Sequence, residues 1–74
     1  MKAYRNLSGQ SGVTAYELGE GRIAVEFVDG ARYLYTERSA GKQHIARMQR
    51  LAQAGRGLSS YISRHVRDGY ERKD

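Results

Sequence analysis

The first half of the chain alternates apolar and polar residues with a period of two, which is typical of strands that bury one face. The clearest alternation runs from 22 to 28, where Ile23, Val25 and Phe27 fall on one side. A second strand is predicted at 31–36 and a shorter one at 13–17. Glycine-containing turns separate the three segments, so the pattern predicts three consecutive antiparallel strands.

The turn at Asp29-Gly30 decides which residues share a face with Val25. A two-residue turn would place Tyr33 and Tyr35 on the face opposite Val25. A three-residue turn, with Gly30 in the left-handed conformation, pairs Val25 with Tyr33 and brings both tyrosines to the same side. We favour this second register because it gathers the large apolar side chains on one face of the sheet.

From residue 39 onward the apolar positions recur with the helical period of 3.6 residues. In the first helical segment these positions are Gly41, His44, Ile45, Met48, Leu51, Ala52 and Gly55. Ser39 is expected to cap this helix, and Gly55 is expected to end it in the left-handed conformation. A second helix is predicted to follow Gly57 and to end near residue 68 or 69.

Three strands followed by two helices predict an α+β domain, in which a three-stranded antiparallel sheet carries both helices on one face. The chain has 74 residues, which is enough for one such domain, and we place it at 13–70. Residues 1–12 are rich in Ser, Gly, Asn and Gln and are expected to be a flexible N-terminal segment. Residues 71–74 are expected to be a polar tail, with Tyr70 packed back onto the domain.

The composition excludes several kinds of site. Without cysteine the chain cannot form a disulfide framework, an iron–sulfur cluster or a thiolate zinc site. His44 and His65 lack the spacing of a zinc motif, and we expect both to be hydrogen-bonded structural residues. No catalytic constellation is visible, so we predict a non-enzyme without a cofactor. The chain also lacks a long apolar run, and we expect a cytoplasmic protein with no membrane partner.

Positive charge gathers in the second half of the chain. Residues 38–74 hold nine Lys or Arg against three Asp or Glu, whereas residues 1–37 are nearly balanced. Arg47 and Arg50 are neighbours on one flank of the first helix, and Lys42 lies on the other flank. The cations predicted to bind RNA or another polyanion are Arg47, Arg50, Arg56, Arg64, Arg67 and Lys42. The competing interpretation is a solvated helix face in which Arg64 pairs with Asp68 and Arg67 with Glu71.

Three further alternatives remain open from the residues. Tyr33 and Tyr35 could stack on unpaired bases, although the favoured register makes them core residues. The segment 55–57, which precedes the second helix, could hold an anion or could be a simple helix cap. The uncovered sheet face, with Ala24, Val28 and Leu34, could form a weak homodimer or bind a protein partner without any role in nucleic-acid binding.

The order and spacing of these motifs resemble the KTSC domain, a family of small bacterial and phage proteins named from the C-terminus of some lysyl-tRNA synthetases. The matching residues are Ser11, Val13, Tyr16, Ile23, Val25, Phe27, Gly30, Tyr33, Tyr35, Gly57, Ile62, Val66, Arg67 and Tyr70. The resemblance covers 11–70 and implies the β-β-β-α-α order and, through the synthetase context, a role near RNA. Residues 36–39 lack the Val-Pro step of the family, so the start of the first helix is expected to differ.

Overall fold

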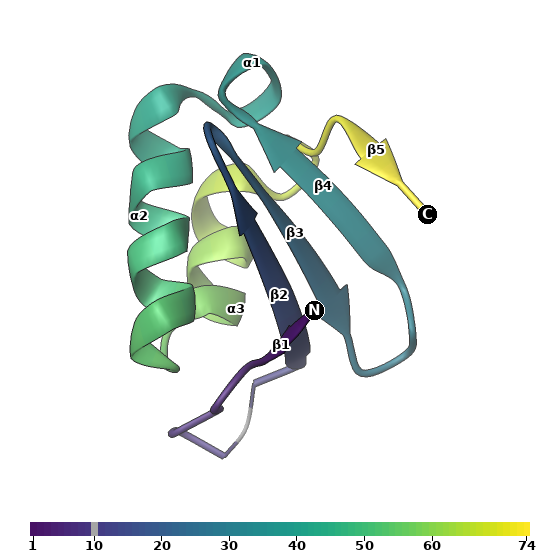
Figure 1. Ribbon diagram of the computed structural model, residues 1–74, viewed down its shortest axis with the longest axis vertical. Coiled ribbons are helices and arrows are strands. Elements are labelled where there is room, and N and C mark those ends of the chain that lie inside the picture. Colours follow the sequence, from purple (N-terminus) through teal and green to yellow (C-terminus); the bar gives the residue numbers. More distant parts are fainter. Residues whose placement is uncertain (10) are drawn as a thin grey trace.

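The computed structural model describes residues 1–9 and 11–74 and shows an α+β fold, with an antiparallel sheet that carries the helices on one face (Figure 1). The strands, which are also neighbours in this order in the sheet, are β1 (Lys2–Ala3), β2 (Val13–Gly19), β3 (Arg22–Phe27), β4 (Arg32–Thr36) and β5 (Arg72–Lys73). The helical segments are α1 (Glu37–Ala40), α2 (Lys42–Ala54), α3 (Leu58–Tyr61) and η1 (Ile62–Val66), a π-helical turn that continues α3.

The sheet has five strands, so the predicted three-stranded sheet is wrong in number. The additional strands, β1 and β5, have two exposed residues each and lie at the two edges. β1 pairs Ala3 with Ala15, and β5 pairs Leu34 with Arg72. Two exposed residues cannot display a period of two, and this is why the hydrophobic pattern does not reveal these edge strands.

Tyr4 brings the N-terminal segment into the core. Its side chain is 5% exposed, and its hydroxyl accepts a hydrogen bond from the Leu58 backbone N–H at 3.3 Å. Its ring also meets Tyr16 edge-on, with 6.5 Å between ring centroids. The segment predicted to precede the domain therefore contributes both an edge strand and a core side chain, while Gln10 of that segment lies outside the described residues.

The β3–β4 hairpin has the predicted three-residue turn. Gly30 has a φ of +89°, and the strands pair Val25 with Tyr33 and Ile23 with Tyr35. Tyr35 is fully buried and Tyr33 is partly buried against the core, as expected for this register. Tyr70 packs on both rings, at centroid distances of 4.9 Å from Tyr33 and 6.3 Å from Tyr35.

The first long helix begins at Lys42, so the prediction that Ser39 caps it is wrong. Thr36 instead caps the one-turn helix α1: its hydroxyl accepts from the Ser39 N–H at 3.1 Å, and the Ser39 hydroxyl accepts from the Thr36 N–H at 3.0 Å. Gly41, with a φ of +99°, then separates α1 from α2. Thr36 takes this role because it ends β4 in an extended conformation, which directs its hydroxyl toward the following turn.

The core lies between the sheet and the inner sides of the helices. Ile45, Met48 and Ala52 of α2 are buried, as the helical period predicts. The remaining buried apolar residues are Tyr4, Val13, Tyr16, Ile23, Val25, Tyr35, Leu58, Ile62 and Val66. Burial of these side chains fixes both helices on the same side of the sheet and leaves their opposite sides to solvent.

Gly55 ends α2 in the left-handed conformation, as predicted, with a φ of +77° and its N–H bonded to the Leu51 carbonyl at 3.0 Å. A Cβ at this position would lie 2.9 Å from the Cβ of Arg5. We expect Gly55→Ala to lower the free energy of unfolding by about 2–3 kcal/mol in urea denaturation, through backbone strain and this clash. Gly30→Ala is the control, because Gly30 also has a positive φ but open space around it. Equal losses in the two variants would contradict the role of the Arg5 contact.

Burial, together with the neighbouring Tyr33 and Tyr70, raises the pKa of Tyr35 to about 12. The phenol has a pKa of about 10 in the unfolded chain, so it contributes stability below pH 10 that is lost as the pH rises from about 10 to 12. We expect this loss to reach about 3 kcal/mol and to be absent in Tyr35→Phe, measured by urea denaturation at a series of alkaline pH values. An unchanged loss in Tyr35→Phe would contradict the assignment of this pH dependence to Tyr35.

Candidate functional site

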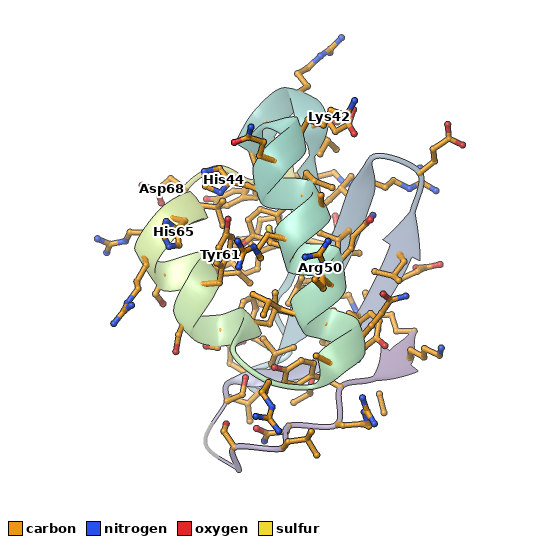
Figure 2. All side chains as sticks on the ribbon, turned by 90° about the vertical axis from the view of Figure 1, so that its left-hand side faces the viewer. Lys42, His44, Arg50, Tyr61, His65 and Asp68 are labelled. Carbon is orange, nitrogen blue, oxygen red and sulfur yellow. The ribbon has the colours of Figure 1, made fainter. Side chains whose placement is uncertain are left out.

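The outward sides of α2, α3 and η1 form a surface that is rich in cations, with the carboxylate of Asp68 at one end. Between Lys42 and Arg67 the sequence contains no Asp or Glu. The helices lie side by side on the sheet, and Figure 2 views their outward sides, with Arg50 on the exposed side of α2. We call this the basic surface; its cations are Lys42, Arg47, Arg50, Arg56, Arg64 and Arg67, and all six are exposed.

The structure divides these six cations into two pairs and two single positions. Arg47 and Arg50 lie on adjacent turns of α2. Arg64 of η1 and Arg67, which follows η1, together line a hollow of about 330 Å³ at the end of that helix. Lys42 begins α2, whereas Arg56 lies in the turn after it, so these two cations mark opposite ends of the surface.

Neither predicted ion pair of the second helix forms. Among the described residues, the ion pairs are Arg32 with Glu26 at 2.8 Å and Arg72 with Asp74 at 3.4 Å, and both lie in the sheet region. The carboxylate of Glu71, one of the predicted partners, instead accepts a hydrogen bond from the Thr36 hydroxyl at 2.8 Å. Among the described residues, no guanidinium group of the basic surface therefore forms an ion pair, although Asp68 lines the same hollow as Arg64 and Arg67.

Two histidines and a tyrosine meet where α2 faces the second helix (Figure 2). Nδ1 of His44 is 2.6 Å from the hydroxyl of Tyr61, and the imidazole rings of His44 and His65 are 5.8 Å apart. His65 also lies over Tyr61, at 4.5 Å between ring centroids. The hydrogen-bonded role predicted for His44 is confirmed, whereas His65 is exposed. Sequence spacing does not pair these residues, because their proximity depends on how the helices pack.

Arg5 adds a cation that the sequence analysis does not assign to this region. Its Nη2 donates a hydrogen bond to the Gln53 carbonyl at 2.7 Å, near the C-terminal end of α2. A cation is favourable there because the last carbonyl groups of a helix carry a partial negative charge. Nothing in the local sequence around Arg5 indicates this contact, since it joins segments 48 positions apart.

The glycines of 55–57 act as helix caps. Gly55 and Gly57 both have positive φ angles, of +77° and +78°. The Leu58 N–H, at the start of α3, already donates to the hydroxyl of Tyr4. Because α3 has only four residues and one of its first N–H groups is occupied, the structure favours the cap over the anion site.

The sheet face opposite the helices mixes charges of both signs. A hollow of about 290 Å³ on this face is lined by Glu17, Arg22, Arg32, Arg72 and Asp74, together with the partly exposed Ala24 and Leu34. Val28 is 77% exposed in the β3–β4 turn. The apolar residues considered for a dimer contact are thus few and interspersed with ion-paired groups.

Within residues 1–9 and 11–74, no cluster of three or more His, Cys, Asp or Glu side chains could hold a metal ion. No helix in this part of the chain has the length and apolar character needed to cross a membrane.

No protein-family model, curated protein or solved structure matches this chain. The resemblance to the KTSC domain therefore stays a prediction.

Proposed function

We propose that this protein is a small, non-catalytic module that binds RNA by contacting its phosphate backbone with the basic surface. The observation that carries this proposal is the uninterrupted positive charge from Lys42 to Arg67, on exposed side chains without carboxylate partners. Such a surface attracts a polyanion and releases its condensed counterions on binding.

The chemistry of the side chains suits phosphate. Five of the six cations are arginines, and a guanidinium group can donate two parallel hydrogen bonds to one phosphate. Arg47 and Arg50, one turn apart on α2, would contact neighbouring positions of a strand, and Arg64 and Arg67 would do the same from the second helix. Contacts of this kind read charge and spacing rather than base sequence.

The competing function is self-association through the sheet face opposite the helices. The ion pairs on that face and its small apolar content give it less support. Thermal melting and RNA binding together distinguish the two functions. A melting temperature that depends on protein concentration, in a protein without affinity for RNA, would favour self-association over our proposal.

We expect the logarithm of the RNA association constant to fall linearly with the logarithm of the salt concentration, measured by fluorescence anisotropy with a labelled single-stranded oligonucleotide. Arg47→Gln combined with Arg50→Gln should weaken binding and reduce the magnitude of the slope by roughly 0.7 for each lost phosphate contact. Arg22→Gln combined with Arg72→Gln removes the same charge from the opposite face and serves as the control. Equal effects of the two double variants would mean that overall charge, rather than the basic surface, governs binding.

A further inference from the structure

A second hollow lies beside the basic surface and is not used in the proposed backbone contacts. It has a volume of about 460 Å³, within the range of about 300–1,000 Å³ typical of small-ligand pockets. Ser59, Ser63 and Arg67 line it from the second helix, at steps of four residues. These residues form a different row from Tyr61 and His65, which face α2, so the hollow opens on another side of the same helix.

The opposite wall of this hollow, which we call the aromatic pocket, consists of rings. Phe27, Tyr33 and Tyr70 line it and are partly buried. Phe27 meets Tyr33 at 5.4 Å with an angle of 88° between the rings, and Tyr33 meets Tyr70 at 4.9 Å with an angle of 69°. Tyr33 also stacks on the buried Tyr35, at 6.3 Å and 25°, and Nζ of Lys73 lies 5.4 Å over its ring, so Phe27 and Tyr70 pack around a Tyr33 ring that has contacts on every side.

Charged groups complete the aromatic pocket. Arg67 and Asp68 both line it, both are exposed, and neither belongs to an ion pair of the described residues. They also line the hollow of about 330 Å³ that Arg64 shares. Arg67 thus stands between the basic surface and the aromatic pocket, where it can hold a phosphate whose attached nucleoside reaches inward.

The side chains that line the aromatic pocket favour some classes of ligand over others. An aliphatic ligand would leave the Asp68 carboxylate and the Arg67 guanidinium without partners. A nucleotide matches each part, because its base offers a π-face to the rings and N–H donors to the carboxylate, and its phosphate binds arginine. We propose that the aromatic pocket takes one unpaired base of the bound RNA strand, with the base against Phe27 and Tyr70 and its phosphate on Arg67, while Tyr33 supports these two rings from behind.

This inference rests on the proposed function and deepens it, since it makes single-stranded RNA the substrate class. The test uses a single-stranded RNA oligonucleotide that carries one 2-aminopurine, and heparin as a polyanion without bases. Ser63→Trp fills the pocket from an exposed position without removing a core side chain, and Ser60→Trp, on an exposed residue of α3 outside the pocket, is its control. Heparin affinity reports the basic surface alone.

We expect the wild-type protein and Ser60→Trp to quench 2-aminopurine fluorescence, as stacking on a ring does. Ser63→Trp should bind the RNA about tenfold more weakly than the wild-type protein and Ser60→Trp, with unchanged heparin affinity. Asp68→Asn, which keeps the volume of the side chain, should weaken RNA binding in the same direction. Equal RNA affinity of all variants, with heparin still bound, would overturn the pocket and leave the proposed function standing. Loss of both RNA and heparin binding by the wild-type protein would overturn both.

An independent measurement covers the case in which Ser63→Trp does not fold. Adenosine 5′-monophosphate should shift the NMR resonances of the Phe27, Tyr33 and Tyr70 ring protons in the wild-type protein and leave those of the buried Tyr4 in place. Shifts confined to the arginines of the basic surface would show phosphate binding alone and would contradict the assignment of a base to the aromatic pocket.

Discussion

The fold depends on one constraint: the sheet has one apolar face, and the apolar sides of the helices cover it. Ile23, Val25 and Tyr35 present that face, and Met48 at the centre of α2 packs against it with no exposed surface. The three-residue turn at Gly30 is part of the same constraint, because a shift by one residue would turn Tyr35 to solvent. Both helices therefore give their apolar sides to the sheet, and the positions of all charged groups follow from this arrangement.

The arginines on the two outer faces of the molecule differ in whether they form ion pairs. On the open face of the sheet, Arg32 and Arg72 have carboxylate partners, as is typical of a surface that serves solubility. On the helix side, the stretch from Lys42 to Arg67 has cations only. Since like charges that are close together destabilise a folded domain, such a face is unfavourable for the isolated protein. An anionic partner would relieve this repulsion, and this is the physical reason for proposing that RNA binds on the helix side.

The sequence predicts those parts of the fold in which apolar residues recur at a regular spacing. Alternation along 22–28 and 31–36 predicts β3, β4 and their register, and the helical period predicts the buried face of α2 and its end at Gly55. It does not predict β1 and β5, whose strands are too short to show a pattern, or the capping role of Thr36, which depends on where β4 ends. For the candidate site, helical geometry predicts that Arg47 and Arg50 are neighbours. Other features of the site depend on tertiary packing between distant segments. They are the proximity of the His44 and His65 rings, and the pocket that Arg67 lines together with the aromatic rings.

The π-helical turn η1 explains how one helix can serve two surfaces. The Arg67 N–H donates to the Ile62 carbonyl at 2.7 Å, five residues back, so this turn holds one residue more than an α-helical turn. Ile62 and Val66 nevertheless both remain in the core, each 6% exposed. Arg67 and Asp68 follow this turn and line both the hollow of about 330 Å³ and the aromatic pocket, whereas Arg64 lines the first of these hollows but not the aromatic pocket. The wider turn thus precedes the one guanidinium group of this helix region that lies between the basic surface and the rings proposed to hold a base.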